Sequence, residues 1–277
     1  MLPIKKLYID SKARSKDSRS TSDFAIDLVE SLTMPDGAVF QVCDVLIPHT
    51  WYLIDEHNCN IYFNEVQPQF RSGNFSIALT MGNYDGDSLA GEISKQIQAA
   101  TTKIFKYAVN YDTSTGRIRI TASIDNGVSG AQSQWQILTD TEVLQNTFFN
   151  IVDNPKSLNA FLGNTTSQSY IPDDPFGDAF HSGRLQFTRI KYLFIRSANL
   201  GTFNTLGSFG ERTIIKKVPV TAPQGEIILD DTRSGNDVLN CAKQTFKRLE
   251  FTITDERGNI IDLNGHDTSF SLIFSIV

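Results

Sequence analysis

The two ends of this 277-residue chain carry the pattern that most constrains its fold, because both alternate apolar and polar side chains with the period of a β-strand. After a strand-like stretch at 7–11, Phe24, Ile26 and Leu28 alternate with polar residues. Toward the other end, strand patterns at 249–254 and 268–274 flank a turn at Gly258-Asn259, which together predict a terminal hairpin. We expect the last strand to pack near the first, as it does in a closed β-sandwich.

Short strand-like segments recur between the two ends. Residues 38–47 form an apolar run that predicts a strand buried on both faces, and Pro48 ends it. Further segments lie around 61–63, 75–79, 192–195, 214–220 and 227–229. Roughly ten such strands separated by turns are typical of a sandwich or jelly roll. The 19 Phe residues agree with this, since aromatic side chains suit a pleated, half-buried surface. The predicted fold class is therefore all-β, a jelly-roll β-sandwich.

The period changes between residues 80 and 165. Asp87 or Ser88 can cap a helix that places Leu89, Ile93, Ile97 and Ala100 on one face. A hairpin pattern follows at 107–120, and a short helix is predicted from 140 to 148. We therefore predict an inserted small α+β domain at 80–165, set in a jelly-roll domain formed by 21–79 and 166–277.

The first 20 residues differ in charge from the rest of the chain. They hold six basic side chains against Asp10 and Asp17, a net charge of +4, while the remainder stands at −10. We interpret residues 1–20 as a basic N-terminal arm that contacts a polyanion or an acidic neighbour. A solvated, mobile terminus explains the same composition equally well. The candidate contact residues of the arm are Lys5, Lys6, Lys12, Arg14, Lys16 and Arg19.

Two long polar stretches, at 164–184 and 199–212, have the composition of loops. Each holds aromatic residues among Gly, Asn and Asp, and exposed aromatic side chains in loops favour interfaces. The alternative is that these rings fold back to fill the ends of the sandwich. The candidate interface residues are Phe176, Phe180, Phe203 and Phe209.

No recognisable catalytic motif accompanies these segments. The four His residues lack the spacing of a zinc site, and the chain holds neither a Gly-x-Ser-x-Gly elbow nor a phosphate-binding loop. The acidic pairs at 173–174 and 230–231 lie outside any calcium-loop pattern. We predict no catalytic residues, no metal, no cofactor and no enzymatic activity. The absence of a signal peptide and of a long apolar window predicts an intracellular chain without a membrane span.

The order of the short motifs resembles a known family. The opening Leu7-Tyr8-Ile9-Asp10-Ser11 with Ser22-Asp23-Phe24, and the internal Gly82-Asn83-Tyr84 before a helix, are similar to the penton and minor capsid proteins of small double-stranded DNA viruses of the polinton-like, virophage and adintovirus kind. The closing motifs at 249–255, 258–259, 262–265 and 270–272 follow the same pattern. The match is spread over most of the chain and is weakest over 125–185.

This resemblance implies a structural virion protein, a penton subunit that assembles as a homopentamer at the five-fold vertices of an icosahedral capsid. It also implies contacts with neighbouring major capsid proteins and with other minor capsid or fibre proteins, and a weak contact of the arm with packaged DNA. The capsid would assemble in the host cytoplasm or nucleus. The chain has no Arg-Gly-Asp sequence, so an integrin-binding loop is not implied.

Other functions fit the residues as well. A receptor- or carbohydrate-binding spike head would use aromatic and acidic residues gathered at one loop end, and a minor capsid protein could sit between capsomers. A hydrolase on a jelly-roll scaffold would need two close carboxylates with different pKa values. A jelly roll serves all of these functions, so the fold alone does not choose among them.

Overall fold

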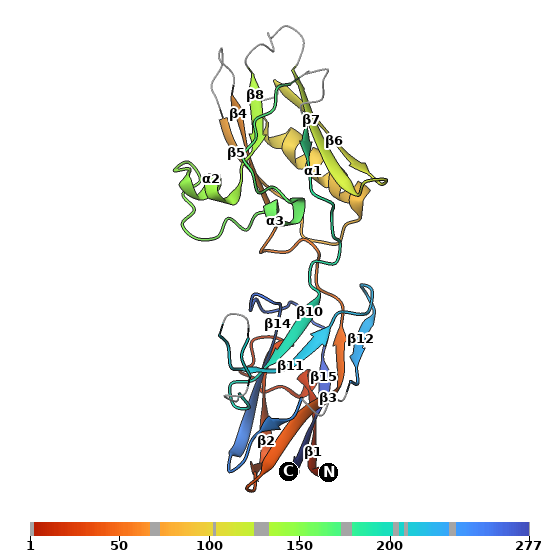
Figure 1. Cartoon of the computed structure of the whole chain (residues 1–277), viewed down its shortest axis with the longest axis vertical. Helices are drawn as coiled ribbons and strands as arrows, with labels where there is room; N and C mark the ends of the chain where they lie inside the picture. Colours follow the sequence, from red (N-terminus) through yellow and green to blue (C-terminus); the bar gives the residue numbers. More distant parts are fainter. Residues whose placement is uncertain are drawn as a thin grey trace. The chain divides into compact units, whose positions relative to one another are not determined.

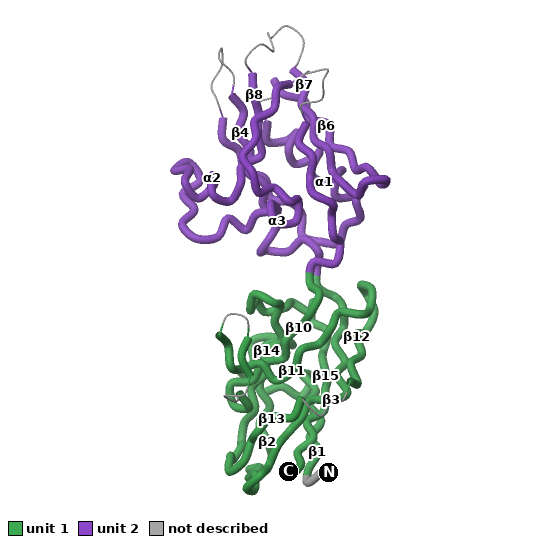
Figure 2. The backbone as a smooth tube through the Cα atoms, viewed as in Figure 1, with its two compact units in different colours: residues 1–51, 190–277 green, residues 52–189 purple. Residues whose placement is uncertain are grey.

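The computed structural model describes residues 3–66, 73–101, 104–124, 133–172, 179–201, 205–207, 210–232 and 237–276. The chain divides into two compact units (Figure 2). Unit 1 combines residues 1–51 with residues 190–277, and unit 2 is the continuous segment 52–189. Each unit has its own hydrophobic core.

The elements of unit 1 are β1 (Pro3–Asp10), the short 3-10 helix η1 (Ser11–Ala13), β2 (Asp23–Thr33), β3 (Ala38–Pro48), β10 (Tyr192–Arg196), β11 (Ile214–Pro219), β12 (Ile227–Asp230), β13 (Leu239–Asn240), β14 (Thr245–Thr254) and β15 (Ser269–Ile276). Those of unit 2 are β4 (Asn60–Val66), β5 (Gly73–Ala78), α1 (Gly86–Ala100), β6 (Phe105–Asp112), β7 (Arg117–Ile124), β8 (Gln134–Ile137), α2 (Asp140–Gln145), α3 (Asn159–Leu162) and β9 (Phe180–His181).

Unit 1 is a sandwich of two antiparallel sheets (Figure 1). One sheet has the order β1-β15-β3-β12, with β13 also paired to β3, and the other has the order β11-β10-β14-β2. Without β13, unit 1 has eight strands, which can be numbered one to eight along the chain. In that numbering one sheet has the order 1-8-3-6 and the other the order 5-4-7-2. This alternation of strands between two sheets is a jelly roll. The predicted fold class is confirmed.

The core of the sandwich holds the inward side chains of both sheets, which alternate along each strand. Phe251 on β14 lies at the centre and is 1% exposed. Its ring contacts Phe24 in the same sheet, with 5.6 Å between centroids, and Phe270 in the opposite sheet at 5.0 Å. At the other side of the sandwich, the Lys216 ammonium on β11 lies 3.6 Å from the Asp230 carboxylate on β12. These two contacts place β14 against β15 and β11 beside β12.

The N-terminal strand belongs to the sandwich. β1 pairs antiparallel with β15, and Tyr8 stands opposite Ser271, so the expected closeness of the first and last strands is confirmed. The predicted basic arm over 1–20 therefore includes a strand of the sandwich, because Leu7 and Ile9 give β1 an inward face that packs on the core. The predicted terminal hairpin is wrong. β14 and β15 lie in opposite sheets, and the turn around Gly258 instead folds back on β14, where the Ile261 amide donates to the Ile253 carbonyl.

Unit 2 is inserted between the third and fourth strands of the jelly roll. The sequence pattern placed this insert at 80–165, whereas the unit spans 52–189. The difference arises because β4 pairs with both β5 and β8, which draws residues 60–78 into the same sheet as 134–137. At the other boundary, β9 pairs with β7, and the Arg189 guanidinium lies 2.9 Å from the Asp55 carboxylate.

Helix α1 packs on strands of two three-stranded sheets, β5-β4-β8 and β6-β7-β9. Leu89, Ile93 and Ile97 are buried as the helical spacing predicted. The cap lies two or three residues before the predicted ones. Asp85 is the N-cap residue, and its side chain and that of Ser88 exchange hydrogen bonds with each other's backbone amides. The hairpin predicted at 107–120 is β6–β7, and the helix predicted at 140–148 ends at Gln145.

Candidate assembly site at the N-terminal segment

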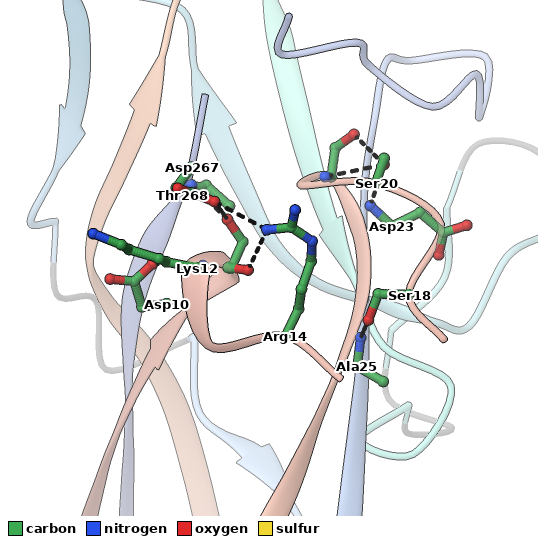
Figure 3. Close-up of polar contacts among 11 residues, drawn as sticks. Asp10, Lys12, Arg14, Ser18, Ser20, Asp23, Ala25, Asp267 and Thr268 are labelled. Atoms are coloured by element: carbon green, nitrogen blue, oxygen red, sulfur yellow. Dashed lines mark hydrogen bonds and ion pairs between the residues drawn. The ribbon is translucent and has the colours of Figure 1, made fainter. Parts of the chain in front are cut away.

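Residues 11–20 connect β1 in one sheet to β2 in the other, and they are tied to the sandwich at both ends (Figure 3). At the first end, the Ser11 amide donates to the Thr268 carbonyl at 2.9 Å, and the Thr268 amide donates to Ser11 Oγ at 3.0 Å. Arg14 Nη1 donates to the Ser11 carbonyl at 2.9 Å and to the Asp267 carboxylate at 3.3 Å. The backbone of η1 is therefore held against the turn that precedes β15.

The second part of the segment covers the free edge of β2. The Ser15 amide donates to the Ala25 carbonyl at 2.8 Å, and the Ala25 amide donates to Ser18 Oγ at 3.1 Å. The Asp23 amide donates to Ser20 Oγ at 2.9 Å (Figure 3). An edge strand with unpaired amides and carbonyls is a template for pairing with another chain. The serine-rich composition of the segment is thus explained by hydroxyl groups that satisfy this edge.

Replacing Ser18 and Ser20 together by alanine tests this role of the hydroxyl groups. Each change removes the acceptor for one amide of β2, and a lost hydrogen bond of this kind costs about 1 kcal/mol. We expect faster hydrogen exchange at Ala25 and Asp23, measured by NMR. The matched control is Ser114→Ala in unit 2, which should leave both amides unchanged. Unchanged exchange in the double variant would show that the hydroxyl groups do not protect the edge.

Beside this edge, three carboxylates gather around one guanidinium. Arg248 on β14 lies 2.7 Å from Asp17, 3.3 Å from Asp27 and 3.4 Å from Glu250. The hydrogen bond from Arg248 lowers the pKa of Asp17, and the same bond raises the pKa of Arg248. We call these four residues the carboxylate cluster; with all four ionised, it carries a net charge of −2 on an exposed surface.

The predicted contact residues of the segment divide into two groups. Arg14 and Arg19 form ion pairs, the first with Asp267 and the second with Asp23 at 3.3 Å. Lys5, Lys6, Lys12 and Lys16 are exposed. The two arginines thus contact carboxylates of the same unit and the four lysines are exposed, while a contact of these six residues with a partner stays a prediction.

The predicted loop aromatics do not form a site in the described part of the chain. Phe176, Phe203 and Phe209 lie outside the described residues. Phe180 is 3% exposed and packs in the core of unit 2, with its ring 6.3 Å from that of Tyr170. The interface prediction is wrong for Phe180, because pairing of β9 with β7 turns this ring inward. The alternative, a ring that folds back into the domain, is the one observed.

Sequence reasoning missed an apolar patch on unit 1. Leu46 on β3 and Ile227 and Leu229 on β12 point away from the core and are 40%, 61% and 60% exposed. Leu46 stands directly opposite Leu229 in the strand register. The signal was present in the sequence, since 45–47 and 227–229 are apolar at every position, whereas a strand with one solvated face alternates. We call these three residues the apolar patch.

Within the described residues, no group of three or more His, Cys, Asp or Glu side chains is placed to hold a metal ion. No helix in the described part of the chain is long and apolar enough to cross a membrane.

Comparison with known proteins was made for sequence and for fold. No protein-family model matches the chain, and no curated protein matches it in sequence. Among solved structures, the crystal structure of the mavirus penton protein superimposes with a TM-score of 0.52, covering 99% of this chain and 100% of that one. The chain shares its fold with a viral penton protein. At 11% sequence identity the likeness lies in the fold, which confirms at that level the resemblance seen in the sequence motifs.

Proposed function

We propose that this chain is a structural capsid protein, a penton subunit that closes the five-fold vertices of an icosahedral virion as a homopentamer. The observation that carries the proposal is the end-to-end match to the mavirus penton protein, in which sandwich and inserted unit are covered together. A jelly roll alone would be weak support, because many unrelated functions use it. A jelly roll matched together with a unit of 138 residues inserted at one connection is more specific.

The surface chemistry supports an assembly role. The described residues offer a patch of exposed apolar side chains, a carboxylate cluster and four exposed lysines on one sandwich. Exposed apolar groups beside charged ones are the usual composition of a protein–protein contact. In the proposed capsid, the exposed lysines at 5–16 contact acidic surfaces of neighbouring subunits or of the neighbouring major capsid proteins. Contacts with packaged DNA, with fibre proteins and with other minor capsid proteins belong to the same proposal, as does assembly in the host cytoplasm or nucleus.

The test is the mass of the purified chain in solution, measured by native mass spectrometry and light scattering over a range of protein and salt concentrations. We expect a pentamer. A stable trimer would contradict the vertex role and favour a spike head or a minor capsid protein between capsomers. A chain that remains monomeric at the highest concentrations, and that fails to enter capsids when expressed with a major capsid protein, would also overturn the proposal.

A further inference from the structure

The two outer faces of the sandwich differ in character. The outer face of sheet β1-β15-β3-β12, here the first face, bears the apolar patch at β3 and β12 and the exposed Lys6 at β1. The outer face of sheet β11-β10-β14-β2, here the second face, bears the carboxylate cluster at β14 and β2. At β10 the second face presents Tyr192, which is 38% exposed, and the half-buried Phe194.

The strands of the two faces are aligned across the sandwich. The ring contact between Phe270 and Phe251 places β15 against β14, and the ion pair between Lys216 and Asp230 places β12 against β11. From the two sheet orders, β1 and β2 then lie on one side of the β15–β14 pair, and β3, β12, β10 and β11 lie on the other, where β11 also approaches β3. Lys6 of the first face and the carboxylate cluster of the second therefore lie on the same side of the sandwich. The apolar patch and the two aromatic residues lie together on the other side.

The heights along the strands also agree. Lys6 pairs with Ile273, three residues beyond Phe270 on β15. Arg248 lies three residues before Phe251 on β14, which runs opposite to β15, so both lie on the same side of the Phe251–Phe270 contact. Lys6 and the carboxylate cluster thus sit at about the same level of the sandwich, on opposite outer faces.

We propose that the first face of one copy packs against the second face of the next copy. This inference rests on the proposed function and names the contact that would close the ring. When copies are related by rotation about an axis parallel to the strands, each residue keeps its level along that axis and its distance from it. Lys6 of one copy therefore meets the carboxylate cluster of its neighbour. In the same contact the apolar patch lies against the part of the second face that holds Tyr192 and Phe194, whose rings also contact the Lys217 ammonium and the Arg196 guanidinium. A contact between two different faces is the kind that closes a ring, and complementary charges fix its register.

A charge exchange tests the electrostatic part. Lys6→Glu should weaken the pentamer several-fold at low salt, because it places a carboxylate against the cluster, and Glu250→Lys should weaken it as well. The two changes combined should recover part of the assembly, since Glu250→Lys brings the cluster from −2 to neutral and so removes the repulsion that Lys6→Glu introduces. Lys5→Glu is the matched control, because Lys5 stands opposite the inward-facing Phe274 and so lies on the other face of β1. Equal effects of Lys5→Glu and Lys6→Glu, or no recovery in the combined variant, would overturn the pairing.

A mixing experiment tests whether the contact joins two different faces of the sandwich. Leu229→Asp blocks the first face and Tyr192→Asp blocks the second, so each variant alone should be monomeric. Their equimolar mixture should give 1:1 dimers, because one contact remains intact between the two variants. Circular dichroism and melting of both variants, compared with the natural chain, show whether each is folded.

The outcomes separate this inference from the function on which it rests. If the natural chain is a pentamer and Leu229→Asp or Tyr192→Asp leaves it so, the assigned faces are wrong and the vertex role stands. If Tyr192→Asp alone still pairs through the apolar patch, the contact joins two identical faces and the inference is wrong. If the natural chain forms a stable trimer, or neither associates in solution nor enters capsids with a major capsid protein, both proposals fail.

Discussion

Replacing Phe251 by alanine is expected to destabilise unit 1 by about 3–5 kcal/mol, the usual cost of removing a buried aromatic ring. The ring is 1% exposed and bridges the two sheets through Phe24 and Phe270, so few neighbours can move in to fill the space. Because unit 2 has its own core, the protection of its backbone amides against hydrogen exchange should not change. Hydrogen exchange followed by mass spectrometry distinguishes the two units, whereas a single melting temperature does not.

The matched control for this experiment is Phe148→Ala, which removes the same ring from a position that is 65% exposed. We expect its effect to stay within about 0.5 kcal/mol. Equal loss of protection in both units of the Phe251→Ala variant would contradict the division into two cores. A small effect confined to unit 1 would show that the sandwich closes around the cavity.

The second large effect is expected from Lys216→Met. The side chains of Lys216 and Asp230 are each 5% exposed, and the ammonium also lies 3.1 Å from the Thr232 carbonyl and 3.4 Å from Asp237. Removing the ammonium leaves a buried carboxylate without its partner, which costs about 3–5 kcal/mol. The loss of stability is measured by denaturant unfolding, with hydrogen exchange of the backbone amides of unit 1 as the readout.

Lys217→Met is the matched control, since the neighbouring lysine is exposed and its ammonium lies over the Tyr192 ring. The double variant Lys216→Met with Asp230→Leu should recover most of the lost stability, because an apolar pair of similar size often replaces a buried ion pair at no cost. If the double variant is as unstable as Lys216→Met, the cost comes from packing of the lysine stem and not from the unpaired charge.

Sequence patterns predicted the elements whose burial follows a simple period. Helix α1 is an example, since Leu89, Ile93 and Ile97 recur every four residues and all three are buried. The alternation of Phe24, Ile26 and Leu28 likewise gave the inward face of β2. These local patterns depend on one buried face per element, which the sequence records directly.

The errors lie where the outcome depends on distant partners. Residues 14–20 lack apolar periodicity and are ordered by hydrogen bonds that the Ser15 amide donates to the Ala25 carbonyl and that Ser18 Oγ accepts from the Ala25 amide, which composition does not reveal. Strand β4 was assigned to the sandwich because its pairing with β8 spans about 70 residues of chain. The candidate site was recovered in part, since the exposed lysines were named, whereas the carboxylate cluster required Asp17 and Arg248 to be brought together across 231 positions.

The pairing of β1 with β15 has a consequence for synthesis on the ribosome. The strand at 3–10 emerges long before its partner at 269–276, while unit 2 is continuous and can fold as soon as residue 189 has emerged. The sandwich can therefore close only after residue 276 has emerged. Chains truncated before residue 269 lack the strand between β1 and β3, so a shell built through this domain would exclude such chains.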